Sequence, residues 1–137
     1  MPTVSGVLET ALYVEDLDRA ARFYEDLFGF ESLFADERLC AFNVAGKQVL
    51  LLFKKGASRS PQPLPGGVIP PHDAAGQIHF ALSIPAADLT AWEEHLTARA
   101  IAIESRIHWG RGGQSLYFRD PDQNLVELAT PGLWAIY

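Results

Sequence analysis

A chain of 137 residues, 48% hydrophobic and 20% charged, has the composition of an ordinary globular protein, either one compact domain or two small modules sharing a core. The formal net charge of −6 disfavours nucleic acid and anionic membrane surfaces as partners, and the single cysteine excludes an internal disulfide. No apolar run approaches the roughly 20 residues of a membrane helix, and the N-terminus lacks a basic region followed by an apolar stretch, so we expect a cytoplasmic protein.

The first half of the chain predicts a strand, a helix and three more strands. The first strand is expected over 6–14. The helix should begin with Asp16 as its N-cap and end at Gly29, a residue type that readily adopts the left-handed conformation. Apolar residues recur at helical spacing between them: Leu17, Ala20, Tyr24 and Leu27. Short strands are then predicted over 30–34, 39–44 and 48–53.

The segment 54–76 differs in kind from the rest of the chain. It holds five prolines and four glycines, so we expect no regular element there. A loop of this length in a small domain usually serves as a linker or as a functional lid. We predict that it is the most mobile part of the backbone unless a ligand or partner chain orders it.

The second half repeats the pattern of the first. A strand is expected over 77–84, followed by a helix that opens at Pro85 or Ala86 and carries three apolar residues on one face, Leu89, Trp92 and Leu96. Further strands are expected over 102–107, 114–119 and 125–129, with a turn at 110–113. The repeat predicts a single domain, 1–137, built from two βαβββ modules: module 1 over 5–55, the linker or lid over 54–76, and module 2 over 77–130.

Three of the expected strands each carry an ionisable residue among apolar or small neighbours: Glu9, His79 and Glu127. A buried, unpaired charge costs several kcal/mol (about 3–5 when a partner is missing), so such a residue needs a partner or a metal. Taken singly, a strand glutamate is most often exposed to solvent and a histidine most often a hydrogen-bonded core residue. Glu9 and His79 nevertheless fall at matching places in the two repeats. We therefore predict that these three residues converge on one divalent metal.

The repeat also predicts how many protein ligands the metal has. The counterpart of Glu127 in the first half is Leu51, which cannot bind a metal, so the site should have three protein ligands rather than four. The faces of the strands favour a nearby substrate. Glu9 shares its face with Ala11 and Tyr13, and small residues beside a ligand leave room for a bound molecule.

Two stretches carry a resemblance to a known family: residues 13–29, YVEDLDRAARFYEDLFG, and residues 118–127, FRDPDQNLVE. They resemble the vicinal oxygen chelate superfamily, which includes glyoxalase I, bleomycin-resistance proteins, fosfomycin-resistance enzymes and extradiol dioxygenases. The resemblance covers nearly the whole chain. It implies an α+β fold in which two βαβββ modules form a cup-shaped mixed β-sheet with flanking helices around a divalent metal.

The resemblance also carries over single residues. His79 matches the histidine of the second module and Glu127 the closing glutamate, whereas Glu9 stands where the family usually has histidine or glutamine. Leu51 disfavours glyoxalase I activity, and Glu9 departs from the two-histidine, one-carboxylate triad of extradiol dioxygenases. Two carboxylates suit Mn²⁺, Fe²⁺, Ni²⁺ or Zn²⁺ without choosing among them.

Two functions of different classes follow. The first is a metal-dependent lyase, isomerase or dioxygenase in which the metal chelates two oxygens of a small substrate, with Glu127 as the catalytic residue. The second is a metal-free binding protein that sequesters a small toxic or aromatic ligand, as bleomycin-resistance relatives do. Residues expected to line the substrate pocket in either case are Tyr13, Phe53, His72, Trp109 and Tyr117. The expected partners are a small molecule and a second copy of the chain in a homodimer, with no nucleic acid and no membrane.

Overall fold

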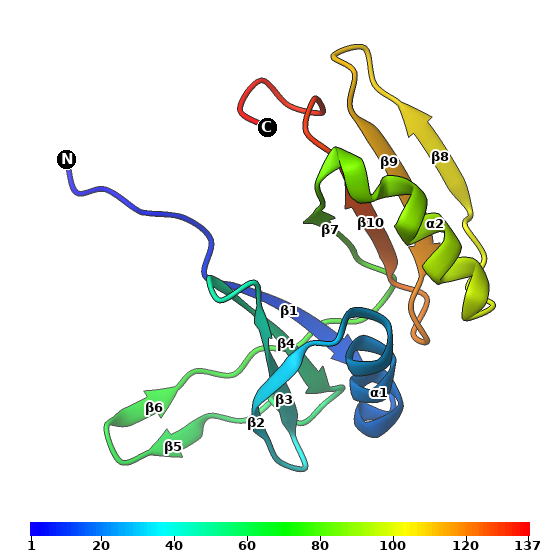
Figure 1. The fold of residues 1–137 in the computed structure, drawn as a ribbon. Coiled ribbons are helices and arrows are strands. Elements are labelled where there is room, and N and C mark those ends of the chain that lie inside the picture. Colours follow the sequence, from blue (N-terminus) through cyan, green and yellow to red (C-terminus); the bar gives the residue numbers. More distant parts are fainter. The chain divides into compact units, whose positions relative to one another are not determined.

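The computed structural model describes all 137 residues, and the chain divides into two compact units, Met1–Ala75 and Gly76–Tyr137. Each unit contains one βαβββ set, which confirms the predicted α+β fold of two such modules (Figure 1). The units are described separately below.

Unit 1 is a four-stranded mixed sheet with one helix. Its elements are β1 (Glu9–Val14), α1 (Leu17–Phe28), β2 (Glu31–Ala35), β3 (Leu39–Val44) and β4 (Gln48–Lys54). The strand order is β1-β4-β3-β2, with β1 parallel to β4 and the remaining pairs antiparallel. Helix α1 packs against β4 and β3. It is capped as the sequence predicts: Asp16 accepts a hydrogen bond from the backbone N–H of Arg19, and Gly29 adopts the left-handed conformation with φ 66°.

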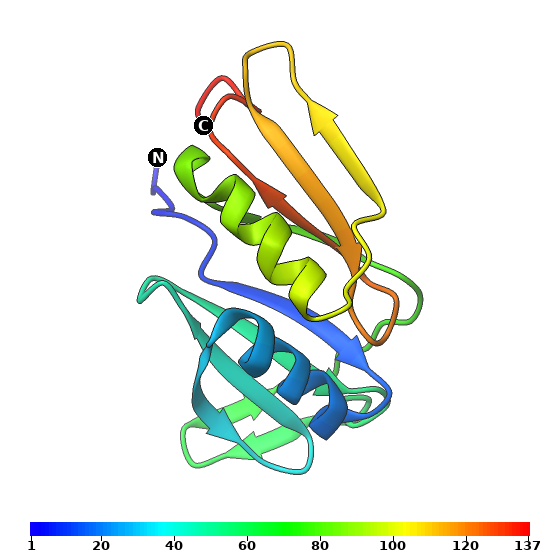
Figure 2. The same ribbon diagram turned by 45° about the vertical axis from the view of Figure 1, so that its right-hand side comes forward.

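Unit 2 repeats this arrangement. Its elements are β7 (His79–Ser83), a 3₁₀ turn η1 (Ala86–Asp88), α2 (Leu89–Ala98), β8 (Ser105–His108), β9 (Gln114–Arg119) and β10 (Leu125–Ala129). The strand order is β7-β10-β9-β8, with β7 parallel to β10. Helix α2 lies along one face of this sheet (Figure 2). None of the helices is both long and apolar enough to cross a membrane.

The segment 54–76 contains regular structure, so the prediction that it has none is wrong. Residues Gln62–Leu64 (β5) and Gly67–Ile69 (β6) form an antiparallel hairpin around Pro65 and Gly66. Proline disrupts the interior of a sheet, but in a two-stranded hairpin every residue lies on an edge, where a missing N–H need not break the pairing. The hairpin belongs to unit 1.

Several strand boundaries also differ from the prediction: β7 covers His79–Ser83 instead of 77–84, β2 covers Glu31–Ala35 instead of 30–34, and the two largest shifts are in β8 and β1. Strand β8 covers Ser105–His108 instead of 102–107. The backbone N–H groups of Arg99, Ala100 and Ile101 bond back to the end of α2, and pairing with β9 starts only where Glu104 N–H donates to the Tyr117 carbonyl. Strand β1 begins at Glu9 rather than at residue 6. Both shifts concern strand ends, where apolar alternation carries little information.

The alternation of faces follows the sequence. In β1, Leu12 and Val14 are fully buried, whereas Glu9, Ala11 and Tyr13 point to the opposite face. In unit 2 the central strand β10 is buried on both faces, so Glu127 lies in the interior with only 4% of its surface exposed.

Candidate metal centre and ligand pocket

Glu127 accepts hydrogen bonds from two side chains of unit 2 and lies beside a third, His79. Its Oε1 atom accepts hydrogen bonds from the Ser115 hydroxyl at 2.5 Å and from the Tyr117 hydroxyl at 3.0 Å. Its Oε2 atom lies 3.2 Å from Nε2 of His79. Hydrogen bonds to an ionised group each contribute about 1.5–3 kcal/mol, so this set can offset the cost of burying the carboxylate. Oε1 is occupied by neutral donors, and Oε2 remains for a cation.

The orientation of His79 fixes the tautomer of its ring. Nδ1 lies 3.0 Å from the carbonyl oxygen of Leu125, and it can make that hydrogen bond only if it carries a proton. In the neutral ring, Nε2 therefore presents a lone pair toward Glu127 Oε2. Two lone pairs at 3.2 Å repel unless a cation lies with them, either a proton on Nε2 or a metal ion.

The spacing of this pair fits a shared metal. Two donor atoms bound at about 2.1 Å to one ion lie about 3.0–3.4 Å apart in octahedral or tetrahedral geometry, and Nε2 and Oε2 are separated by 3.2 Å. The donor set of one imidazole and one carboxylate is also the chemistry that divalent transition metals prefer. His79 and Glu127 thus fit a divalent ion as two of its ligands.

The third predicted ligand, Glu9, belongs to unit 1, at the start of β1. No group of three histidine, cysteine or acidic side chains is assembled closely enough to hold a metal ion. The structure therefore brings together two of the three predicted ligands, and the convergence of Glu9 with them stays a prediction.

Trp109 and Tyr117, which the sequence assigned to a substrate pocket, lie beside Glu127. The Trp109 indole N–H donates to the Ser115 hydroxyl at 2.8 Å, so tryptophan, serine and glutamate form a chain of hydrogen bonds. Burial raises the pKa of the Tyr117 hydroxyl, and its bond to Glu127 raises that pKa further, so Tyr117 acts as a donor at neutral pH. Tyr117 orients the carboxylate directly, and Trp109 orients it through Ser115. The alternation of residues along the strands did not predict these hydrogen bonds.

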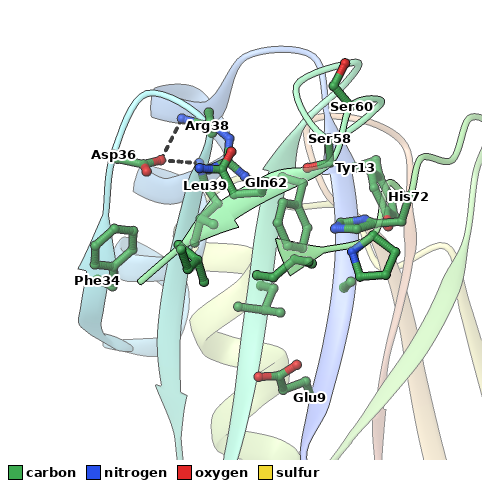
Figure 3. Close-up of a pocket in the computed structure, with 16 residues that line it drawn as sticks. Glu9, Tyr13, Phe34, Asp36, Arg38, Leu39, Ser58, Ser60, Gln62 and His72 are labelled. Carbon is green, nitrogen blue, oxygen red and sulfur yellow. Dashed lines mark hydrogen bonds between the residues drawn. The ribbon is translucent and has the colours of Figure 1, made fainter. Parts of the chain in front are cut away.

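Unit 1 contains a separate cavity of about 590 Å³ between its sheet and the β5–β6 hairpin (Figure 3). Glu9, Tyr13, Phe53 and His72 line it, together with Leu51. We call this cavity the unit 1 pocket. Three of the five residues predicted for the substrate pocket therefore meet here, and the other two lie in unit 2.

An aromatic group forms one wall of the unit 1 pocket. The rings of Tyr13 and Phe53 stack with centroids 5.7 Å apart, and the Tyr13 hydroxyl makes a 2.6 Å hydrogen bond with Nδ1 of His72. Burial, and secondarily the charge of Asp73, raise the pKa of Tyr13, so the hydroxyl keeps its proton at neutral pH. The hydrogen bond is made either by this proton or by a proton on Nδ1. Where the hydroxyl donates, the Nε2–H group of His72 remains as a donor.

Two residues that sequence reasoning missed also line the unit 1 pocket. The Nε atom of Arg38 and the hydroxyl of Ser58 are buried and have no hydrogen-bond partner. Arg38 follows a turn, and Ser58 lies in the segment expected to be irregular. No local pattern distinguishes either from a surface residue. Ser115 was missed too, although it shares its strand face with Tyr117, and that spacing was a usable signal.

The two units place Leu51 and Glu127 at equivalent positions. Leu51 pairs with Ala11, two residues after Glu9, and Glu127 pairs with Ala81, two residues after His79. The predicted repeat relation between Leu51 and Glu127 therefore holds in the register of the strands. Leu51 lies on the same face as Glu9, since both line the unit 1 pocket.

Known proteins similar to this chain share its fold along its length. The model of a protein family described as the glyoxalase/bleomycin resistance protein/dioxygenase superfamily matches residues 6–128. The crystal structure of lactoylglutathione lyase from Agrobacterium tumefaciens is 37% identical, with a TM-score of 0.88, and the match covers 98% of this chain and 99% of that one.

Two curated relatives are similar in sequence. Catechol-2,3-dioxygenase of Bacillus subtilis (strain 168) is 31% identical over 121 residues, which cover 85% of this chain and 38% of the dioxygenase. This chain thus spans well under half of that relative's length. Metallothiol transferase FosB of Shouchella clausii (strain KSM-K16) is 27% identical over 129 residues, which cover 93% of this chain and 81% of the transferase.

Proposed function

This chain belongs to the glyoxalase/bleomycin resistance protein/dioxygenase superfamily, and on that premise we propose that it is a metal-dependent enzyme of the lyase, isomerase or dioxygenase type. Its substrate is a small molecule with two neighbouring oxygens that chelate a divalent metal held by Glu9, His79 and Glu127. The observation that carries the proposal is the approach of His79 Nε2 to Glu127 Oε2 at 3.2 Å, with Nδ1 already committed to a carbonyl.

The bound metal would supply Lewis-acid polarisation of the substrate oxygens, and three protein ligands would leave coordination positions for them. The residues of this chain prepare the donor atoms. The hydrogen bond between Nδ1 and the Leu125 carbonyl directs Nε2 of His79 toward Glu127, and Ser115 and Tyr117 fix the orientation of the Glu127 carboxylate. Partners of this kind typically change metal affinity by about 10–100-fold when they are removed. We assign Glu127 a catalytic role, because its Oε2 atom would bind the metal.

Metal analysis of purified variants tests the proposal. Wild-type protein purified without chelator should carry close to one equivalent of Mn²⁺, Fe²⁺, Ni²⁺ or Zn²⁺ by mass spectrometry. Glu127→Gln and His79→Ala should lose it while the circular dichroism spectrum stays native. Glu94→Gln and His95→Ala make matched controls, because they change the same residue types on α2 and should retain the metal. Unchanged metal content in both test variants would show that the site assignment is wrong.

A second candidate function is sequestration of an aromatic ligand without catalysis. It is favoured by the stacked Tyr13 and Phe53 rings in the unit 1 pocket, an arrangement that needs no metal. A sequestering protein would bind its ligand equally well after treatment with a chelator. It would also keep that affinity in His79→Ala, whereas the enzyme should lose all turnover in that variant. Lactoylglutathione lyase and catechol-2,3-dioxygenase substrates are suitable first compounds for the turnover assay.

The homodimer predicted from the resemblance is part of this proposal. Sedimentation velocity at micromolar concentration, with and without metal, distinguishes a dimer from a monomer of 15.1 kDa. A single species at monomer mass under both conditions would contradict it.

A further inference from the structure

Part of the apolar lining of the unit 1 pocket is exposed to solvent instead of being covered by other side chains. Three large apolar side chains around it are strongly exposed: Phe34 (54%), Leu64 (50%) and Ile69 (45%). Exposed apolar groups gathered around one concavity mark a binding site, because burying them against water-free ligand surface is favourable. The volume of about 590 Å³ is within the range of about 300–1,000 Å³ for small-molecule sites.

The unit 1 pocket also contains polar groups without partners. Ser58 is only 5% exposed, yet its hydroxyl makes no hydrogen bond, and neither does the buried Nε of Arg38. An unpaired buried polar group costs about 1–3 kcal/mol, which a ligand would recover by supplying the missing partner. Arginine can only donate, so the partner must be an acceptor. A carboxylate matches the planar guanidinium best, because two of its N–H groups can bond the two oxygens in parallel.

The charges around the unit 1 pocket determine at which end a carboxylate group of the ligand binds. Asp36 and Glu9 are the two carboxylates that line the unit 1 pocket. Asp36 lies close to Arg38, but its Oδ1 accepts from the backbone N–H groups of Arg38 and Leu39, and no ion pair joins it to the guanidinium. Figure 3 shows Arg38 and Ser58 toward one end of the pocket and Glu9 at the other. Arg38 is the only arginine or lysine in the lining, so its guanidinium is the group that binds an anion, although Asp36 lies at the same end. Glu9 repels a negatively charged group from the other end.

The length of the unit 1 pocket indicates the size of its ligand. Glu9 and Tyr13 lie on the same face of β1, four residues apart, and a strand rises about 3.3 Å per residue, so they are about 13 Å apart. The apolar surface of Leu51 and Phe53 lies between the two ends along the adjoining strand β4. A very small ligand would occupy one end only and leave the exposed apolar groups in water.

We propose that the unit 1 pocket binds an elongated aromatic carboxylate. Its ring lies against Phe53 and Leu51, its carboxylate binds Arg38, and the Ser58 hydroxyl donates to an oxygen at the same end. Where Tyr13 donates to Nδ1, His72 Nε2–H is a further donor beside the ring. This class of ligand is also the substrate class for the proposed function. Only the position of the reacting end of the ligand, toward Glu9, rests on that function.

Binding of model compounds to metal-free protein tests the inference. The probes are 4-phenylbutyrate, its uncharged amide and butyrate, titrated into chelator-treated, ¹⁵N-labelled protein. We expect 4-phenylbutyrate to shift amide signals of residues 9–13, 49–53 and 58–72, and to bind at least tenfold more tightly than the amide or butyrate. Arg38→Gln should remove the preference for the carboxylate over the amide, and Ser58→Ala should weaken binding of the carboxylate. Arg22→Gln, on the exposed side of α1 and outside the pocket, should change nothing.

Equal affinity for the carboxylate and the amide, or shifts confined to residues 76–137, would overturn the inference. A native spectrum of Arg38→Gln shows that the variant is folded, and Arg38→Lys, which keeps the charge but not the planar fork, should give an intermediate affinity. The titration is done without metal, and the proposed function is tested by metal content. The failure of one is therefore distinguishable from the failure of the other.

Discussion

The imidazole of His79 shows how a single backbone contact prepares a cation site. The Leu125 carbonyl accepts a hydrogen bond from Nδ1–H, so Nε2 faces Glu127 either with a lone pair or with a proton of its own. Sequence alternation placed His79 on the right face of β7 but carried no information about its tautomer. The tautomer depends on a carbonyl 46 residues away in the chain, brought alongside by the parallel pairing of β7 and β10.

Leu51→Glu tests the repeat relation at the level of one residue. Leu51 has the register of Glu127 and faces the same pocket as Glu9, so a carboxylate there should add a fourth ligand. We expect tighter metal binding, lower substrate turnover and, without metal, a loss of about 1–3 kcal/mol in the free energy of unfolding from the partly buried charge. Thermal melting with and without a metal series measures both effects.

Leu39→Glu is the matched control, because Leu39 also lines the unit 1 pocket but pairs with Phe53, farther along the sheet from Glu9. It should lose stability without gaining metal affinity. A Leu51→Glu variant whose melting ignores metal and which is as stable as wild type would show that the position does not face the site.

At the scale of elements, the β5–β6 hairpin is held over the sheet of unit 1 by contacts within its flanking segments. His72 N–H donates to the Ser58 carbonyl, and the Asp73 carboxylate accepts from Arg59 at 2.7 Å and, more weakly, from Gly56 N–H at 3.4 Å. These contacts close a loop around the hairpin. That segment 54–76 is the most mobile part of the backbone stays a prediction. When a ligand fills the unit 1 pocket, hydrogen exchange at the amides of Val68 and Ile69 should become slower.

The Arg59–Asp73 contact gives a pH-dependent prediction. The hydrogen bond from Arg59 holds the pKa of Asp73 below its ordinary value of 3.8. A depressed folded-state pKa means that the contact stabilises the loop above pH 3.8 and that this contribution is lost as the pH falls through the lower, folded-state pKa. In Arg59→Gln the pKa of Asp73 should rise toward 3.8, as followed by NMR of the side-chain carboxyl carbon. An unchanged titration curve would mean that Arg59 does not make this contact in solution.

The turn between β8 and β9 depends on a close backbone approach. Gly113 N–H donates to the Gly132 carbonyl, and a Cβ at Gly113 would come within 2.5 Å of the Gly132 carbonyl carbon. Gly113→Ala should therefore lower the free energy of unfolding by about 1–3 kcal/mol through overpacking. Gly110→Ala, in the same turn with no atom within 4 Å of its added Cβ, should change it by less than about 0.5 kcal/mol. Urea denaturation of the two variants makes the comparison, and equal stabilities would refute the proposed close approach.

At the scale of the whole molecule, the proposed metal should link the two units. Glu9 belongs to unit 1, and His79 and Glu127 belong to unit 2, so an ion bound by all three stabilises both. Metal should therefore slow hydrogen exchange in β1 and β4 as well as in β7 and β10. Glu9→Ala should weaken metal binding. In this variant the metal should still slow hydrogen exchange in β7 and β10, but no longer in β1 and β4. Protection confined to unit 2 in the wild-type protein would exclude Glu9 as a ligand.

The sequence by itself determined the strands and helices of the two modules and the faces of those strands. The N-cap Asp16 and the left-handed Gly29 delimit α1, and the two-residue period of a strand puts Glu9 and Tyr13 on one side of β1. These features depend on local backbone geometry, which short stretches of sequence encode. The duplication was readable for the same reason, because each half repeats those local patterns.

Only the tertiary structure decided which polar groups meet and which stay unpaired. The β5–β6 strands are three residues long, too short for a periodic signal, so the hairpin that covers the unit 1 pocket was not predicted. Arg38 and Ser58 became candidates because the Arg38 Nε and the Ser58 hydroxyl are buried without a partner, and Ser115 because it reaches Glu127 across paired strands. Burial and hydrogen-bond satisfaction depend on residues distant in the chain, and for that reason no local pattern of residues contains them.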